Sequence, residues 1–434
     1  MRIFTVHDLE NRLKIPQSRH STVCSGVSVD SRYTQPGQLF IALPGSKTSG
    51  SNYVREAVSK GATAAIVDEN FSGPIDIPLL KVPDTLLAFQ QLAHSLFDTW
   101  HPKIAAITGS VGKSTTKEFL RTILQERYKT AASKGNQNSQ IGLPLSLLNE
   151  TSGEEEALVL EMGMTEKGHI RRLVDIAPPD IVVITRVDLV HAKNFESIHE
   201  IARAKAEIMS HPKTQIAVIH RDIENFAEIK NFGTCRKISF GMHSQDADYS
   251  GSLLDQNISQ FPLRGIHLQH NFLAAVIVAR EWGLTWEEIR LAIPKLRLLS
   301  SRMEEIEKDG VLFLNDSYNA AEISVKAALD SLPTPKKGGR RFAVLGEMLE
   351  LGKYSEECHR RVATHALDKL DGLFLIGPGT QPMQEVWSAQ RREVDIFCDK
   401  QALKEALKKQ ILPGDVVLIK GSRFWELGKI VEEW

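Results

Sequence analysis

The sequence predicts an α/β protein of three domains, and three observations lead to this fold class. The chain has 434 residues, which is more than one ordinary hydrophobic core supports. Short apolar runs alternate with segments that can form helices, the pattern of parallel sheets covered on both faces. A glycine-bearing loop, ITGSVGKST at 107–115, joins one of these runs to a helical pattern, which indicates a nucleotide-binding domain.

Composition is that of a globular protein and excludes some partners. Hydrophobic residues make up 42% and charged residues 25%. The chain has 53 Lys and Arg and 54 Asp and Glu, which gives a net charge of -1. Without a global basic field, neither nucleic acid nor an anionic membrane is an expected partner. With no charged-then-apolar leader and no membrane-length apolar run, we expect a cytoplasmic location. Cys24, Cys235, Cys358 and Cys398 form no CxxC pair, which argues against a zinc site or disulfide framework.

The first domain, a small α/β unit, is expected over residues 1–100. Short strands are predicted within GQLFIAL (37–43) and ATAAIV (62–67), and a turn-rich stretch, LPGSKTSGSN (43–52), lies between them. A helical run, TLLAFQQLAHSLFDTW (85–100), follows and ends at His101-Pro102. Proline at this point favours a domain boundary, because it cannot continue the helix.

The central domain is expected over residues 101–298, as a doubly wound, P-loop ATPase-like unit. Its predicted strands are the apolar runs KIAAIT (103–108), EALVLEMG (156–163), PDIVVITRV (179–187) and TQIAVIHRD (214–222). Each of the last three follows a segment that can form a helix, which predicts parallel pairing.

The third domain is expected over residues 299–434, as a smaller, Rossmann-like α/β unit. It begins near RLLSSRMEEI (297–306) and repeats the alternation with RFAVLGEM (341–348), DGLFLIGPG (371–379) and GDVVLIKGS (414–422).

The loop at 107–115 predicts a site for a nucleotide triphosphate. Its glycines let backbone N–H groups turn inward around an anion, and the positive end of the following helix, expected to start close to Ser114, adds to the attraction. The lysine can reach terminal phosphates and the serine hydroxyl can ligate magnesium. A full Walker pattern has glycine where this chain has Ile107, so the alternative is a glycine-rich turn that binds nothing. The expected nucleotide-binding residues are Gly109, Ser110, Val111, Gly112, Lys113, Ser114 and Thr115.

Two further residues are expected at the same sheet edge. Glu161 ends the strand ALVLE, and ligands of open parallel sheets bind at the carboxyl ends of the strands. A carboxylate there can hold magnesium, although a solvated glutamate is the alternative. His191 follows the strand IVVITRV, and without further support it would be read as a surface residue.

Motifs along nearly the whole chain occur in an order that resembles the Mur ligase family of peptidoglycan synthesis. The segments DSYNA, LGEMLELG and KGSR are most similar to the member that uses D-alanyl-D-alanine. The motifs are ITGSVGKST, GNQNSQIGLPLSLL (135–148), LVLEMG (158–163), IARAKAEI (201–208), HNFLAA (270–275), SRMEEI (301–306), NDSYNA (315–320), VLGEMLELG (344–352) and IKGSRFWELGKIVE (419–432).

The resemblance implies an ATP-dependent amide ligase with magnesium as its metal. It implies a first domain that binds the UDP-linked substrate, a central ATP-binding domain and a third domain that closes over the nucleotide. The γ-phosphoryl group of ATP would pass to the carboxylate of UDP-N-acetylmuramoyl-tripeptide, giving an acyl phosphate that the amine of D-alanyl-D-alanine attacks. A monomer is expected by the same resemblance.

The resemblance assigns roles in phosphate and metal binding to several residues. Lys113 and a magnesium ion on Ser114 and Glu161 would neutralise the phosphates. His191 is placed like the ligand of a second magnesium, and Lys205 matches the lysine that is carbamylated in the family. Without the resemblance, Lys205 would be read as an exposed helical lysine.

Other roles concern the nucleotide and the two acceptor substrates. Asn319 could also cap the helix expected over ISVKAALDSL (323–332). The resemblance places Asn136 and Asn138 near the γ-phosphate and substrate, Asn271 at adenine, Arg302 at the nucleotide, Asp316 with Asn319 at the ribose or domain boundary, Ser31 and Arg32 at the uridine end, and Lys420 and Arg423 at the amine substrate.

The chain departs from the family pattern at positions outside the phosphate and metal set, so an active enzyme is expected. The rivals are a sibling Mur ligase that adds one amino acid, a folate-polyglutamate ligase, a P-loop kinase and a non-catalytic nucleotide-binding protein. The sequence does not indicate which diamino acid the tripeptide carries. The departures are Gln140, Ala321 and Glu322, Ala192 and Lys193, and Ser49-Gly50-Ser51.

Overall fold

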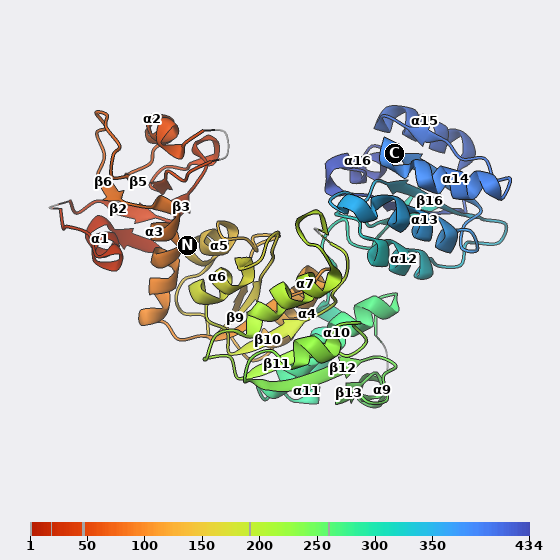
Figure 1. Ribbon diagram of the computed structural model, residues 1–434, viewed down its shortest axis with the longest axis horizontal. Coiled ribbons are helices and arrows are strands. Elements are labelled where there is room, and N and C mark those ends of the chain that lie inside the picture. Colours follow the sequence, from red (N-terminus) through yellow and green to blue (C-terminus); the bar gives the residue numbers. More distant parts are fainter. Residues whose placement is uncertain (1, 19, 46–47, 191, 259–260) are drawn as a thin grey trace.

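The computed structural model describes residues 2–18, 20–45, 48–190, 192–258 and 261–434. Its elements form three α/β units along the chain, with the first and last at opposite ends of the molecule (Figure 1). Each sheet lies within one of the three expected ranges, and the boundaries at residues 100 and 298 stay predictions. None of the helices in the described ranges is long and apolar enough to cross a membrane.

The N-terminal unit contains an antiparallel strand pair, β1–β2, and a parallel sheet in the order β3-β4-β5-β6. The strands expected in GQLFIAL and ATAAIV are present as β4 and β5, and the run at 85–100 forms α3 followed by a short 3-10 helix, Ser95–Asp98. The elements are β1 (Ile3–Thr5), α1 (Val6–Leu13), β2 (Val23–Ser25), β3 (Val27–Ser28), β4 (Leu39–Ile41), α2 (Val54–Ser59), β5 (Ala64–Asp68), β6 (Leu79–Val82) and α3 (Thr85–His94).

The central unit is built on a parallel sheet in the order β13-β12-β11-β10-β7-β9-β8. The expected doubly wound parallel sheet is therefore confirmed. Its elements are β7 (Lys103–Thr108), α4 (Lys113–Leu124), β8 (Thr130–Ala132), α5 (Gly142–Glu150), β9 (Ala157–Glu161), α6 (His169–Ile176), β10 (Ile181–Ile184), α7 (Ile198–Ala206), β11 (Ile216–His220), α8 (Phe226–Lys230), β12 (Arg236–Gly241), β13 (Tyr249–Ser250), α9 (Ser252–Asn257), α10 (Ile266–Glu281) and α11 (Trp286–Ala292).

Both faces of this sheet are covered, and the side chains of its buried strands alternate between them. In β7, Ala105 and Ile107 pack on the face covered by α4 and α10, whereas Ile104 and Ala106 join the core on the opposite face. Successive side chains of a strand point to opposite faces, so a continuous apolar run is needed where both faces are covered. The core that contains Ile104 and Ala106 continues into the N-terminal unit, because α3 of that unit packs against α5 and α6.

The C-terminal unit has a six-stranded sheet in the order β14-β15-β19-β16-β17-β18, with the first pair antiparallel. This hairpin was not predicted, although Asp309-Gly310 is a typical two-residue hairpin turn. Both residues have positive φ, 51° and 76°. The elements are β14 (Glu304–Lys308), β15 (Val311–Asn315), α12 (Glu322–Asp330), β16 (Arg341–Gly346), α13 (Ser355–Ala366), β17 (Gly372–Ile376), α14 (Gln381–Ala389), β18 (Ile396–Phe397), α15 (Lys400–Gln410), β19 (Val416–Lys420) and α16 (Gly428–Glu432).

Candidate active site

A cavity of about 1090 Å³ opens at the carboxyl edge of the central sheet. Its walls include the loop after β7, the ends of β9 and β11, the start of α10, and segments of the C-terminal unit around α12 and after β19. The N-terminal unit contributes Leu86. Carboxyl ends of parallel strands meet at one edge, which is why segments distant in sequence share this wall.

The loop between β7 and α4 is held open by two glycines. Gly112 has a φ of 87°, and a Cβ there would lie 2.5 Å from Oδ1 of Asn271. A Cβ on Gly109 would lie 2.0 Å from Oγ1 of Thr185. The same Thr185 hydroxyl donates to the carbonyl oxygen of Val111 at 2.6 Å, which ties the loop to the segment after β10. Any larger side chain would push these walls apart.

Ser110 ties the loop to the same neighbouring segment. Its hydroxyl donates to the carbonyl oxygen of Asp188 at 2.8 Å, and the backbone N–H of Ser110 donates to Arg186. Helix α4 begins at Lys113, one residue before the expected start, and Thr115 is buried in its first turn. The loop is therefore a preformed concave backbone at the positive end of a helix, the arrangement that binds phosphate.

Lys113 has its ammonium inside the loop. Its Nζ donates to the carbonyl oxygens of Gly109 at 2.8 Å and Ser110 at 3.2 Å. Burial lowers the pKa of Lys113, and the nearby Glu161 carboxylate opposes that shift. An anion in the loop would favour the charged form of this lysine.

A network of oxygen-bearing side chains lies beside the lysine. The Ser114 hydroxyl donates to Oε2 of Glu161 at 2.7 Å, and Nδ2 of Asn138 donates to Oε1 of the same carboxylate at 2.7 Å. Both Ser114 and Glu161 are buried. Neighbouring ligands of an octahedral magnesium ion lie about 3 Å apart, so this hydroxyl and carboxylate fit Mg2+ with little movement. The backbone N–H of Asn138 also donates to the carbonyl oxygen of Asn136 at 2.8 Å.

Arg302 reaches this network from the start of the C-terminal unit. Its terminal NH2 donates to the Ser114 hydroxyl at 3.0 Å, and its guanidinium carbon lies 4.1 Å from the centre of the Tyr318 ring. Its Nε is buried and has no hydrogen-bond partner among the described residues. A buried donor without a partner is unfavourable, and an anionic oxygen of a ligand would satisfy it.

Asp316, which is half-buried, and the buried Lys420 form an ion pair within the C-terminal unit. Lys420 donates to Oδ2 of Asp316 at 2.5 Å and to the carbonyl oxygen of Asn319 at 3.0 Å. The cap predicted for Asn319 is wrong, because α12 begins at Glu322 with Ala321 as its N-cap, and the Asn319 side chain accepts from the next N–H instead. Asn319 and Asp316 nevertheless both line the cavity.

Arg423 differs from Lys420 in its surroundings. It is exposed at the cavity rim, its guanidinium carbon lies 5.6 Å from the Tyr318 ring centre, and no carboxylate within the described parts of the chain pairs with it. Arg302 and Arg423 therefore flank the same tyrosine.

Lys205 lies on α7 and is buried, so the alternative of an exposed helical lysine is wrong. Burial lowers its pKa well below the usual range, and the charge of Lys113 lowers it further. Lys205 also lines the cavity. The predicted metal ligand His191 lies outside the described residues.

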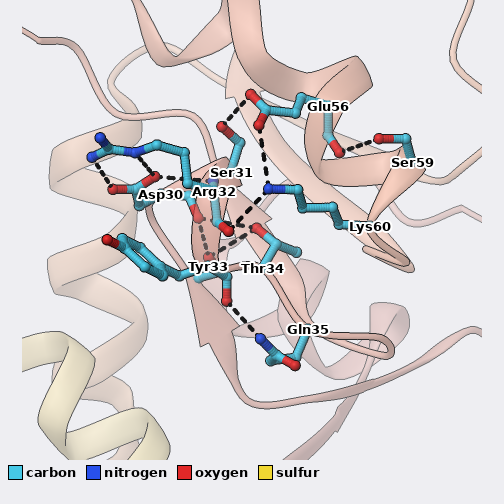
Figure 2. Close-up of polar contacts among 10 residues, drawn as sticks. Asp30, Ser31, Arg32, Tyr33, Thr34, Gln35, Glu56, Ser59 and Lys60 are labelled. Atoms are coloured by element: carbon cyan, nitrogen blue, oxygen red, sulfur yellow. Dashed lines mark hydrogen bonds and ion pairs between the residues drawn. The ribbon is translucent and has the colours of Figure 1, made fainter.

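Ser31 and Arg32, expected at the uridine end, lie apart from the residues that line the cavity within the described ranges. Figure 2 shows their polar contacts at a short 3-10 helix, Ser31–Tyr33. The Ser31 hydroxyl donates to Glu56 at 2.8 Å, and Arg32 makes a two-pronged ion pair with Asp30 at 2.9 and 2.6 Å. Arg32 is exposed, and ion pairs of exposed groups contribute little to stability because water screens them, so its partner can be exchanged readily.

Sequence reasoning missed Lys117, which is fully buried on α4. Its Nζ donates to the carbonyl oxygens of Ser133 and, at 3.0 Å, Gly135, directly before the loop that carries Asn136 and Asn138. The signal was available, because Lys117 is one turn after Lys113 and shares a helix face with buried Leu120 and Leu124.

The departures from the family pattern have ordinary partners. Gln140 accepts from Arg172 at 3.3 Å, and Glu322 pairs with Lys326 and Arg361. The backbone of Lys193 donates to Glu350 of the C-terminal unit at 3.2 Å. None of these contacts involves the phosphate loop.

Comparisons with known proteins match every part of this architecture. Residues 23–95 match the family described as "Mur ligase family, catalytic domain", 107–279 the "Mur ligase middle domain" and 301–423 the "Mur ligase, glutamate ligase domain". The UDP-N-acetylmuramoyl-tripeptide–D-alanyl-D-alanine ligase of Synechocystis sp. is 34% identical over 94% of this chain and 91% of its own length.

Solved structures are similar over the same length. A MurF from Acinetobacter baumannii superposes with a TM-score of 0.86 at 26% identity, covering 99% of this chain and 98% of that chain. The MurF ligase of Thermotoga maritima, solved in complex with ADP, gives a TM-score of 0.79 at 28% identity, with 94% of this chain and 96% of that chain covered.

Proposed function

The chain belongs to the Mur ligase family, and from this premise we propose that it joins D-alanyl-D-alanine to UDP-N-acetylmuramoyl-tripeptide in an ATP-dependent reaction. One observation carries the proposal for the site. Residues of the central and C-terminal units meet in one network, in which Arg302 contacts Ser114 and Ser114 contacts Glu161. Such a network allows one domain to sense whether the other holds a nucleotide.

Each residue of the network has a distinct task in this proposal. The loop from Gly109 to Gly112 and the ammonium of Lys113 hold the phosphates, while Ser114 and Glu161 would hold magnesium, which would supply positive charge next to the phosphates. Arg302 adds a second cation from the other side of the cavity. Because little covalent chemistry is left to the protein, the chain contributes mainly position and charge.

Products follow from the order of the steps. The tripeptide carboxylate attacks the γ-phosphorus, giving an acyl phosphate and ADP. The amine of D-alanyl-D-alanine then attacks the acyl carbon and loses a proton, and phosphate leaves with the electron pair of the broken C–O bond. A fixed cationic cavity lowers both barriers, because negative charge gathers on phosphoryl and carbonyl oxygens in each step.

For the substrates, two arginines carry the proposal. Arg423 is the better candidate for the dipeptide carboxylate, since Lys420 is already paired with Asp316, whereas Arg423 is exposed at the rim. A guanidinium fits a carboxylate through two parallel hydrogen bonds. Arg32, with its half-buried partner Asp30, is proposed with Ser31 at the uridine end of the UDP-linked substrate. Monomeric state and cytoplasmic location stay predictions.

Lys205 is proposed to carry a carbamate. Its neutral amine attacks CO2 and loses a proton, which converts a potential cation into an anion. The lowered pKa favours the neutral nucleophile, and the neighbouring charge of Lys113 disfavours a second cation but attracts an anion. With 13C-labelled bicarbonate, we expect one carbamate signal in the 13C NMR spectrum of the purified protein.

Lys205→Met should lack that carbamate signal, and Lys167→Met, which removes an exposed lysine paired with Glu200, should keep it. Acidification should release the CO2, since protonation of the amine opposes carbamate formation. A spectrum that is the same for the protein and Lys205→Met would contradict the modification.

The function is tested by phosphate release from ATP with UDP-N-acetylmuramoyl-tripeptide, in the presence and absence of D-alanyl-D-alanine. We expect steady release only when both acceptors are present, with one UDP-linked pentapeptide formed for each phosphate. Mass spectrometry of the product identifies the added dipeptide.

Two other results would replace the proposal. Release that requires a single amino acid and a shorter UDP-peptide would identify a sibling ligase. Nucleotide binding without release in any substrate combination would identify a non-catalytic nucleotide-binding protein.

A further inference from the structure

A second cluster of ligand-type side chains lies at the edge of the cavity, and its two histidines, His220 and His270, line the cavity wall. His220 ends β11, Asp222 follows two residues later, and His270 lies on α10. Each offers one nitrogen or carboxylate oxygen, and these three atoms lie within 4.8 Å of one another. None of the three was selected by sequence reasoning, because 48 residues separate the second from the third in the chain.

Burial explains why the imidazoles could act as ligands. His220 is 2% exposed, and its burial, together with the charges of His270 and Arg186, lowers its pKa to about 3. Burial also lowers the pKa of His270. Burial therefore disfavours the protonated form of both rings, and the neutral imidazole is the form that binds metals.

The hydrogen-bond pattern of the rings points the same way. Nδ1 of His220 is buried and has no hydrogen-bond partner in the described parts of the chain, which is unfavourable for a buried polar atom. Nδ1 of His270 lies 2.9 Å from the carbonyl oxygen of Ile266, a contact that places its proton there and leaves a lone pair on Nε2. Metal-binding histidines commonly have their second nitrogen held in this way.

We propose that His220, Asp222 and His270 bind a divalent transition-metal cation, for which Zn2+ is the probe. Two imidazoles and one carboxylate suit a borderline cation better than magnesium, which prefers oxygen ligands. Ligands of a tetrahedral zinc ion lie about 3.3 Å apart, so the site must contract. Asp222 can supply this movement because it is exposed, with its carboxylate oriented by the Ser244 hydroxyl.

Two features oppose a very tight site. Nε2 of His270 already accepts from the backbone N–H of Met242, although at 3.3 Å this hydrogen bond is long and easily replaced. The Arg186 charge that lowers the pKa of His220 also repels a cation, and the Asp222 carboxylate compensates for it. We therefore expect affinity below that of closed four-ligand zinc sites.

The test is a Zn2+ titration of the full chain against a chromophoric chelator, with excess Mg2+ present to fill the Ser114–Glu161 pair. One equivalent should bind, and Asp222→Asn should weaken binding at least about 10-fold. This variant is expected to fold, since Asp222 is exposed. The matched control is His101→Gln, an exposed histidine at the start of the central unit, which should leave Zn2+ affinity unchanged.

X-ray absorption at the zinc edge gives an independent readout. Nitrogen and oxygen donors with histidine scattering are expected, and sulfur donors would assign the zinc to cysteines and overturn the proposal. Equal Zn2+ affinity in the unmodified chain and Asp222→Asn would overturn it as well. Neither outcome depends on ligase activity, so failure here is distinguishable from failure of the proposed function.

Discussion

Lys113→Met is expected to lower kcat/KM by about 10³-fold without lowering the melting temperature. The ammonium has two carbonyl oxygens of the phosphate loop as its hydrogen-bond partners, and no other cation from the central unit is held inside that loop within the described ranges. Its burial disfavours the charged form, so an apolar side chain of similar length is tolerated in the folded state. The variant therefore loses the electrostatic stabilisation of the phosphates, and not the stability of the fold.

Phosphate release measures the first effect and thermal unfolding the second. Lys167→Met, at an exposed lysine paired with Glu200, is the matched control and should change neither value appreciably. Lys113→Met with normal turnover would remove this lysine from the mechanism.

Lys113 also has a pH signature in the unmodified chain. Burial lowers its pKa, so kcat/KM, which reports the free enzyme, should begin to fall at lower alkaline pH than for an exposed lysine. Bound phosphates favour the charged form of Lys113, so kcat should stay constant up to a higher pH than kcat/KM does.

Arg302→Met is expected to lower kcat by about 10³-fold, the scale seen when an arginine that reaches the phosphoryl group from another domain is removed. Its contact with Ser114 crosses from the C-terminal to the central unit, and its buried Nε awaits an acceptor. Arg302→Lys should recover little activity, since a point charge replaces neither the planar contact with Tyr318 nor the second donor.

Arg297→Met is the matched control, because this exposed arginine of the same segment bonds only to nearby carbonyl oxygens in the described structure. Affinity for the UDP-linked tripeptide should be unchanged in both variants. Small-angle scattering should show compaction with an ATP analogue in the unmodified chain and less in Arg302→Met. Unchanged kcat in Arg302→Met would refute the cross-domain role.

The fold could be predicted from the sequence where signals are local. Continuous apolar runs of four residues, IAAI and ALVL, lie within β7 and β9 because both sheet faces are covered. The glycines at 109 and 112 mark a loop that has no room for a Cβ. The C-terminal hairpin was missed because Glu304–Lys308 has few apolar residues, although the Asp309-Gly310 turn was a usable signal.

By itself, the sequence determined the α/β class, the phosphate loop and the order of family motifs, since each depends on neighbours along the chain. Only the tertiary structure decided which side chains meet. It brought Arg302 to Ser114, paired Lys420 with Asp316, buried Lys205, and gathered His220, Asp222 and His270. Burial, which sets pKa and hydrogen-bond demand, depends on packing between distant segments, and a local pattern indicates it only where apolar neighbours mark a covered face, as they do for Lys117 on α4.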